Sequence, residues 1–273
     1  MTLAELKQIF ISKLEKCYDK NEIEQLFLIY IEDKLNLTFN PSFVIENEEN
    51  IEKDILLLQE YKPIQHITGK AFFYDDFFKV SQHTLIPRPE TEELIELIRN
   101  NHSENDTLSI IDLGTGSGCI PISLKKIFRN ANVAALDISN EALQIAKENA
   151  KNIVNNEITF YENDLLKDIN LAEKFDIIIS NPPYIRNLEK QEMHKNVLEH
   201  EPHLALFVDD NDPLVFYKRV IEFAKNHLNK NGFVYCEINQ YLPEETKELF
   251  DEHFRNVEVI KDISGNYRML IAN

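Results

Sequence analysis

The sequence predicts an α/β protein in which a mostly parallel, doubly wound sheet of seven strands follows a small helical domain. Two observations support this: from Leu108 onward, apolar β-branched segments alternate with amphipathic ones, and three of the chain's six glycines lie within residues 114–118. Such alternation is typical of parallel sheets with helices on both faces. Glycines directly after an apolar segment fit a tight strand-to-helix turn. We expect strands at 108–112, 132–136, 157–161, 175–180, 232–238, 256–261 and 267–272, and helices at 118–129, 140–153, 213–228 and 243–252.

Residues 1–68 predict a separate helical domain, because apolar residues recur there at helical spacing. A packing module without chemistry and a substrate-recognition domain both remain open for it. The expected helices cover 2–16, 21–35 and 51–61, with a short helix over 63–69 that proline opens and glycine closes.

The linker between the domains, residues 69–90, should contain a β-hairpin over Phe72–Val80, whose aromatic residues and valine flank the polar pair Asp75-Asp76. The sheet domain then extends over 91–273, and its first helix should begin at Pro89 or Thr91. Two prolines on either side of Arg88 stiffen the end of the linker. Arg88 forms either a surface ion pair or a clamp over a ligand at the domain junction.

Composition narrows the classes of partner. The 273 residues carry a net charge of −18, and no basic stripe is evident, which argues against duplex DNA as the main partner. No apolar run approaches the roughly 18 residues of a membrane span. The three cysteines, Cys17, Cys119 and Cys236, are far apart and match no metal spacing. They favour a reducing compartment, so we expect a cytoplasmic protein.

Histidines and acids gather in residues 194–203 and raise the question of a metal site. The side chains concerned are His194, Glu199, His200, Glu201 and His203. Their spacing fits no common metal motif. We therefore expect no metal, and a solvated loop that flanks a substrate groove.

The glycine cluster has the sequence Gly114-Thr115-Gly116-Ser117-Gly118. Its G-x-G-x-G spacing differs from the G-x-G-x-x-G dinucleotide fingerprint. It is not a phosphate loop either, since no Gly-Lys-Ser/Thr follows. The cluster predicts a turn at which the backbone approaches a ligand closely, and phosphate binding is not favoured.

Acids follow the next two predicted strands. Asp137 ends the second strand, about 20 residues after the glycines, where a carboxylate can accept from both hydroxyls of a ribose. Asp164 follows the third strand and could accept from an adenine amino group, with Leu165 against the ring. Each acid could alone be an ordinary turn or helix-start residue. Together, at successive strand ends on the ligand edge of the sheet, they predict a nucleoside pocket.

The fourth strand leads into Asn181-Pro182-Pro183-Tyr184. Two consecutive prolines fix an extended turn, and neither donates a backbone hydrogen bond. The Asn181 side-chain carbonyl and the Pro182 carbonyl can accept the two hydrogens of a planar NH₂ group, while Tyr184 stacks on its plane. An ordinary strand-ending loop is the alternative for the tetrapeptide in isolation.

Taken together, this layout resembles the class I S-adenosylmethionine methyltransferases, and the tetrapeptide resembles the subset that methylates amino groups. The closer resemblance is to the release-factor glutamine methyltransferases of the HemK/PrmC type. It covers nearly the whole chain and is carried by Leu85–Glu92, Asp112–Cys119, Ser180–Ile185, His200-Glu201-Pro202 and Ala205-Leu206.

The resemblance implies N5-methylation of the glutamine in the Gly-Gly-Gln motif of peptide chain release factors, with S-adenosylmethionine as donor and S-adenosylhomocysteine as product. Asn181, Pro182, Pro183 and Tyr184 would hold the glutamine. The cofactor would contact Arg88, Gly114, Thr115, Gly116, Ser117, Gly118, Asp137, Asp164, Leu165 and Asn181.

Three positions depart from the family pattern: Asp75 stands where glycine is usual, residues 210–214 replace an Asp-Gly-Leu type turn, and His200 stands where Phe or Tyr is more common. All lie outside the predicted cofactor and amide-binding motifs. We expect a monomer whose partners are release factors, without DNA or membrane. The alternatives are a glutamine methyltransferase of a large-subunit ribosomal protein, a nucleic-acid amino-methyltransferase and a catalytically silent adaptor.

Overall fold

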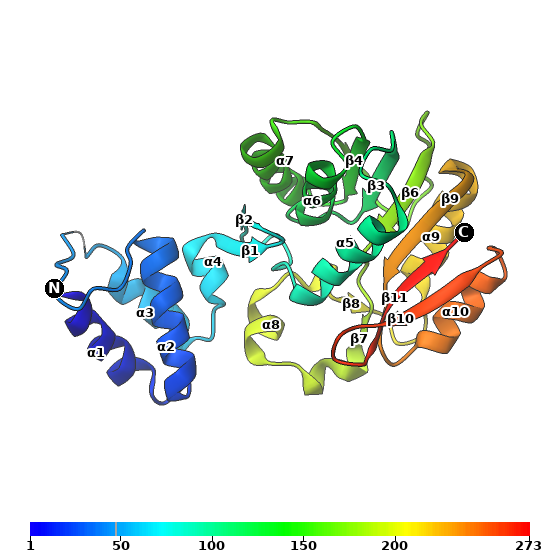
Figure 1. The fold of residues 1–273 in the computed structure, drawn as a ribbon. Coiled ribbons are helices and arrows are strands. Elements are labelled where there is room, and N and C mark those ends of the chain that lie inside the picture. Colours follow the sequence, from blue (N-terminus) through cyan, green and yellow to red (C-terminus); the bar gives the residue numbers. More distant parts are fainter. Residues whose placement is uncertain (47) are drawn as a thin grey trace.

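The computed structural model describes residues 1–46 and 48–273 and contains a helical N-terminal domain joined to a sheet domain (Figure 1). In the helical domain, Thr2 caps the first helix through a capping box with Glu5, and Asp19 caps the second. The apolar faces of these helices meet in one core, as the helical spacing predicted. The elements are α1 (Leu3–Leu14), α2 (Lys20–Ile29), the π-helix η1 (Tyr30–Lys34), α3 (Ile51–Gln59) and α4 (Ile64–Thr68).

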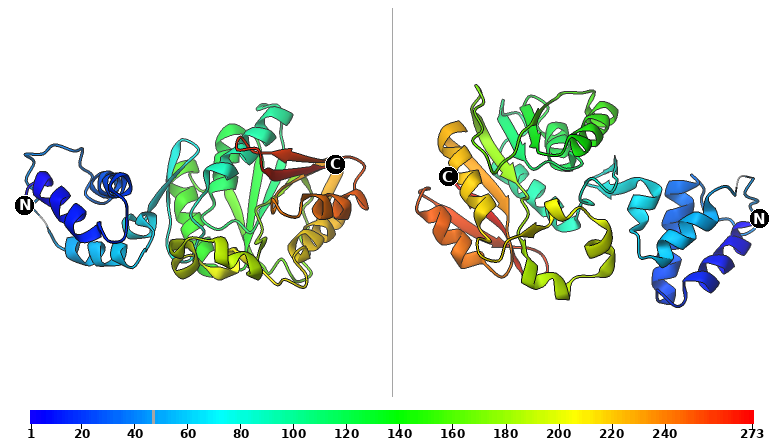
Figure 2. Two further views of the ribbon diagram at one scale, coloured as in Figure 1. Left: turned by 90° about the horizontal axis from the view of Figure 1, so that it is seen from below. Right: turned by 180° about the vertical axis from the view of Figure 1, so that it is seen from behind.

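A hairpin of β1 (Lys70–Phe73) and β2 (Asp76–Lys79) links the domains and is visible from below and behind in Figure 2. The expected position of its turn was one residue too late. Asp76 pairs with Phe73, so the turn residues are Tyr74 and Asp75, at φ 43° and 69°. Positive φ at both central residues is the geometry that a two-residue hairpin requires. Asp75 therefore occupies a backbone conformation that favours glycine.

The sheet domain contains the predicted seven-stranded sheet, in the order β10-β11-β9-β6-β3-β4-β5. The five strands from β9 to β5 are parallel, and β10 and β11 add an antiparallel edge. One boundary differs from expectation, because β9 begins at Leu228, directly after α9. The strands are β3 (Ser109–Leu113), β4 (Asn132–Asp137), β5 (Ile158–Glu162), β6 (Phe175–Ser180), β9 (Leu228–Glu237), β10 (Val257–Lys261) and β11 (Tyr267–Ala272).

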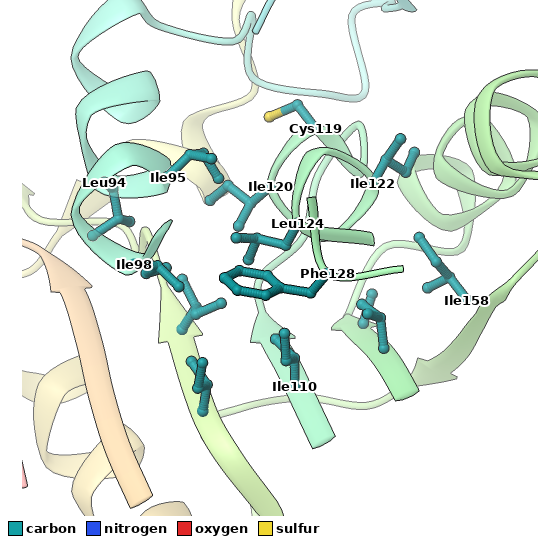
Figure 3. Packing of buried hydrophobic residues seen from close by; sticks show 14 of the residues in the cluster. Leu94, Ile95, Ile98, Ile110, Cys119, Ile120, Ile122, Leu124, Phe128 and Ile158 are labelled. Atoms are coloured by element: carbon teal, nitrogen blue, oxygen red, sulfur yellow. The ribbon is translucent and has the colours of Figure 1, made fainter. Parts of the chain in front are cut away.

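Helices cover both faces of this sheet. On one face, α5 (Pro89–Asn101), α6 (Cys119–Ile127) and α7 (Asn140–Val154) pack through a single apolar cluster. Figure 3 shows Ile110 of β3 among side chains of α5 and α6 in this cluster. On the other face lie α9 (Val215–His227) and α10 (Pro243–Asp251). Full burial of one such side chain stabilises the fold by about 1.5–3 kcal/mol.

The segment between β6 and α9 contains short elements that the sequence did not predict. β7 (Ile185–Arg186) and β8 (Phe207–Val208) pair in parallel, and between them lie η2 (Asn187–Glu192), α8 (Lys195–His200) and η3 (His203–Ala205). We call residues 185–208 the β7–β8 segment. None of the helices in the described part of the chain is both long and apolar enough to span a bilayer.

Candidate active site

Two neighbouring pockets open at the carboxyl edge of the parallel strands. The first, which we call the glycine pocket, has a volume of about 270 Å³. The turns after β3, β4 and β5 form its wall, as predicted for a ligand site in a doubly wound sheet. Its lining includes Gly114, Gly116, Asp137, Asp164 and Leu165.

The glycines of this pocket are needed for backbone geometry. Gly116 has φ 55°, and its N–H donates to Asp137 Oδ2 at 2.8 Å. Gly118 has φ 80°, and a Cβ there would lie 3.1 Å from the side chains of Ala146 and Ile122. A side chain at either position would therefore strain the turn.

Thr115, Ser117 and Gly118 belong to the turn, whereas Gly114 and Gly116 line the pocket itself. The Thr115 and Ser117 side chains are buried, and the Ser117 carbonyl accepts from Asn149 Nδ2 at 2.9 Å. These three residues shape the backbone around the pocket. A direct contact between them and a cofactor stays a prediction.

Asp137 presents a carboxylate that the backbone holds in place. Ser139 N–H donates to Oδ1 at 2.9 Å while Gly116 N–H donates to Oδ2. Burial raises the pKa of Asp137, and the backbone N–H groups of Ser139, Gly116 and Ile138 oppose that rise. Each carboxylate oxygen can accept a further hydrogen bond, so the pair suits two vicinal hydroxyls.

Asp164 and Leu165 lie at the far side of the same pocket. Asp164 Oδ1 accepts from Leu166 N–H at 2.9 Å, and Oδ2 lies 3.3 Å from Lys167 Nζ. Leu165 is 8% exposed and belongs to the apolar cluster beneath the sheet. The arrangement offers an acceptor beside an apolar surface, which suits a base with an exocyclic amino group.

The second pocket, which we call the tyrosine pocket, has a volume of about 500 Å³. Its walls come from the linker, the end of β6, the end of β9 and the β7–β8 segment. Asn181, Pro182, Leu85 and Ala205 line both pockets, so the pockets meet there. Pro183 faces the glycine pocket, while Tyr184, Glu90, Arg88, Glu237 and Arg268 line the tyrosine pocket.

A hydrogen-bond network fixes Asn181. Its Nδ2 donates to Glu237 Oε2 at 2.9 Å and to Thr91 Oγ1 at 3.2 Å. Thr91 Oγ1 donates to the same Glu237 oxygen at 2.8 Å, and the Tyr184 hydroxyl donates to Oε1 at 2.7 Å. Burial and the nearby Glu237 raise the pKa of Tyr184, which keeps its hydroxyl protonated.

The sequence analysis missed Glu237, Thr91 and Arg268. Glu237 ends β9, so the strand-end rule that identified Asp137 also applied to it. Thr91 lies in the first turn of α5, and Arg268 lies on the antiparallel strand β11. No local motif marks these two residues.

Arg88 lies in the tyrosine pocket rather than the glycine pocket. Its Nη2 is 2.5 Å from Glu201 Oε1, and Glu201 Oε2 accepts from Ile86 N–H at 3.1 Å. Glu201 is 4% exposed, so the expectation of a solvated loop was wrong for this residue. It is buried because it bridges the linker to the β7–β8 segment.

The histidines of residues 194–203 serve different contacts. His194 lines the tyrosine pocket, and His203 Nε2 donates to the Leu198 carbonyl at 2.7 Å. His200 Nε2 donates to the Glu60 carbonyl of the helical domain at 2.7 Å. Among the described residues, no group of three His, Cys, Asp or Glu side chains is placed to hold a metal ion.

Comparisons with known proteins define the class first. Residues 90–205 match the family model of the Methyltransferase small domain. The fold is similar to the solved hMettl16 catalytic domain in complex with MAT2A 3'UTR hairpin 1, with a TM-score of 0.58 at 16% identity over 92% of this chain and 90% of that one. The chain therefore has the class I methyltransferase fold.

The family follows from closer relatives. The chain is 47% identical over 285 residues to the release factor glutamine methyltransferase of Flavobacterium psychrophilum, covering 100% of this chain and 99% of that protein. It is 40% identical over 269 residues to the one of Bacteroides thetaiotaomicron, covering 95% and 96%. The chain belongs to the release factor glutamine methyltransferase family.

Proposed function

We propose that this protein transfers a methyl group from S-adenosylmethionine to the side-chain nitrogen N5 of the glutamine in the Gly-Gly-Gln motif of peptide chain release factors. S-adenosylhomocysteine is the second product. The observation that carries the proposal is the junction of the two pockets at Asn181 and Pro182. A donor bound in the glycine pocket and an amide bound in the tyrosine pocket come together there.

The glycine pocket fits S-adenosylmethionine in its donor and acceptor chemistry. Asp137 accepts from the ribose hydroxyls, Asp164 accepts from the adenine amino group, and Leu165 packs against the ring. Gly114 and Gly116 let the backbone approach the ligand closely. When bound, the sulfonium supplies an activated methyl group, so the protein's own contribution is alignment.

Alignment of the glutamine amide falls to Asn181 and Pro182. An amide nitrogen is a weak nucleophile, because its lone pair is delocalised into the carbonyl. Asn181 Oδ1 and the Pro182 carbonyl would accept its two hydrogens and hold the nitrogen at the junction of the two pockets, toward the glycine pocket. Positioning of this kind can supply about 7–11 kcal/mol of the barrier. Tyr184 stacks on the amide plane, and the proton leaves to water after transfer.

The helical domain, residues 1–68, and the linker 69–90 provide the release-factor docking surface in this proposal. Its basis is their place beside the tyrosine pocket, since Leu85 and Arg88 line that pocket and His200 bonds to Glu60. We further propose that the enzyme is a cytoplasmic monomer, in keeping with the free thiols of Cys17, Cys119 and Cys236.

A labelled-methyl transfer assay tests the function. Purified protein is offered release factor, its Gly-Gly-Gln variant with Gln→Ala, ribosomes, and DNA in separate reactions. The proposal expects label on release factor alone, and none on the Gln→Ala variant. Label on a ribosomal protein or on nucleic acid would establish the corresponding alternative instead.

A further inference from the structure

Glu237 lies between Asn181 and Tyr184, two of the predicted site residues, and bonds to both. It ends β9, whose Cys236 pairs with Ser180 of β6, so Glu237 and Asn181 are neighbours at the sheet edge. Glu237 is only 2% exposed. A buried carboxylate costs stability unless hydrogen bonds or charges compensate it.

Three donors compensate this carboxylate. Tyr184 and Thr91 donate hydroxyl protons, and Asn181 donates an amide proton, all at 2.7–2.9 Å. Burial raises the pKa of Glu237, whereas the bonds from Tyr184 and Thr91 and the Arg268 cation favour the ionised form. Oε2 accepts from both Thr91 and Asn181, so this oxygen acts as an acceptor.

The direction of each bond then follows. Because Thr91 gives its only hydroxyl proton to Glu237, its oxygen can serve Asn181 solely as an acceptor. Both acceptors near Asn181, which are Glu237 Oε2 and Thr91 Oγ1, therefore face its NH₂ group. A flipped Asn181 amide would place its carbonyl oxygen against two acceptor oxygens, Glu237 Oε2 and Thr91 Oγ1, which is unfavourable.

We propose that Glu237 is a positioning residue: it holds the Asn181 amide so that Oδ1, and not Nδ2, is presented to the substrate, and it thereby sets the preference for glutamine over glutamate. This inference rests on the proposed binding of the glutamine amide at Asn181 and Pro182. With Oδ1 presented, the site consists of two carbonyl acceptors. A substrate NH₂ satisfies both, whereas a carboxylate satisfies neither.

The experiment compares Glu237→Met with Glu237→Gln in the full-length protein. Methionine removes every acceptor at this position, so Asn181 can rotate. Glutamine can keep its carbonyl oxygen toward Asn181 and Thr91 and turn its NH₂ group to Tyr184, whose hydroxyl can rotate to accept. We expect Glu237→Met to lower kcat by about 100-fold and Glu237→Gln to retain most activity. Cofactor affinity should stay within twofold in both.

A binding measurement separates positioning from stability. Calorimetry gives the Kd of each enzyme for release factor and for a release factor whose Gly-Gly-Gln glutamine is replaced, Gln→Glu. The preference for the glutamine form should fall about tenfold in Glu237→Met, because a rotated Asn181 can donate to a carboxylate. Thr91→Val, which removes the second acceptor of the Asn181 N–H, should lower the preference in the same direction by less.

Asp54→Leu is the matched control. Asp54 is also a buried carboxylate that accepts from a tyrosine hydroxyl, Tyr30, at 2.9 Å, but it lies in the helical domain. Its replacement should lower the melting temperature and leave the glutamine preference unchanged. If Glu237→Met fails to fold, Thr91→Val and Glu237→Gln still measure the preference.

The outcomes are distinct. An unchanged preference in both Glu237→Met and Thr91→Val would overturn the positioning role, as would equal losses of kcat in Glu237→Met and Glu237→Gln. If Thr91→Val alone can be measured, an unchanged preference in it decides against the role. Asn181→Ala serves as the reference for the proposed function itself. Wild-type turnover in that variant would mean that the amide binds elsewhere, irrespective of Glu237.

Discussion

The glycine pocket and the tyrosine pocket are neighbours, yet the chain builds them in different ways. In the glycine pocket, Asp137 bonds to Ser139 and Gly116, which are 2 and 21 residues away in sequence. In the tyrosine pocket, Asn181 bonds to Glu237 and Thr91 across 56 and 90 residues, and Thr91 bonds to Glu237 across 146. The glycines and acids of the glycine pocket come from successive strand-to-helix turns, although the linker and residues 202–205 also line it. The network around Asn181 comes from segments that only the finished fold brings together.

This difference suggests that the two pockets have different roles. A local turn can be read in a motif, and in the proposed function it binds the donor. A pocket assembled from the linker, β6, β9 and the β7–β8 segment depends on the whole domain, and in the proposed function it binds the acceptor. Variants in the glycine pocket should therefore change mainly the affinity for the cofactor, and variants around Asn181 should change mainly the rate of methyl transfer.

Asn181→Ala should have the largest effect. It removes the proposed acceptor at the junction of the pockets, so the nitrogen is no longer directed at the methyl group. We expect kcat to fall by about 10²–10³-fold, as for loss of one preorganised catalytic hydrogen-bonding group. The Kd for S-adenosylmethionine should change less than threefold. Steady-state methyl transfer and calorimetry measure the two quantities on the same preparation, and wild-type turnover would remove Asn181 from the mechanism.

Asp137→Ala should show the converse behaviour. Each hydrogen bond from a hydroxyl group to a charged acceptor is worth about 1.5–3 kcal/mol, so the loss of two should raise the cofactor Kd by at least about 100-fold. With saturating cofactor, kcat should stay within a few-fold of wild type. Asp137→Asn retains one acceptor, so its cofactor Kd should lie between the values of wild type and Asp137→Ala. An unchanged Kd in Asp137→Ala, measured by calorimetry, would place the ribose away from this carboxylate.

The sequence predicted the two pockets unequally, for a physical reason. Gly116, Asp137 and Asp164 each follow an apolar strand closely, so strand periodicity and the edge rule locate these three residues of the glycine pocket together. Asn181 and Tyr184 were found for the same reason. Thr91, which bonds to Asn181, and Arg268, which lines the tyrosine pocket, were not predicted, because a threonine at a helix start and an arginine on β11 are ordinary residues in any local window.

Arg88 shows most clearly what the sequence alone could not predict. The two prolines beside it indicated a rigid segment, and a clamp over a ligand at the domain junction was one of two interpretations. The partner that decides its position, Glu201, lies 113 residues away in a segment whose secondary structure the sequence did not predict. The β7–β8 segment is polar and made of very short elements, which carry too few residues for a periodicity to emerge.

Glu201→Gln tests that long-range contact and should have a moderate effect. It removes the charge that neutralises Arg88 while leaving an acceptor for Ile86 N–H. The Arg88 side chain is 33% exposed, so water compensates part of the loss, and we expect about 1–2 kcal/mol of destabilisation. KM for release factor should rise, since Arg88 lines the tyrosine pocket. Glu199→Gln, at an exposed residue two positions earlier in α8, is the control and should change neither quantity in thermal unfolding or kinetics.

Asp112→Asn should have the smallest effect. Asp112 lies on β3, the strand that leads into the glycine turn. Burial raises the pKa of Asp112 to about 7, far above the roughly 3.9 of an unfolded aspartate. Between these values the native state holds a proton that the unfolded chain releases, so this group's contribution to stability falls as the pH rises from about 4 to 7. Asparagine carries no charge and removes that dependence. The stability of the variant relative to wild type should therefore be higher at pH 8 than at pH 4.5, since only wild type loses this contribution as the pH rises. Urea unfolding at both pH values without ligand measures it. A gap that is equal at both values would mean that Asp112 is ionised throughout in the native protein.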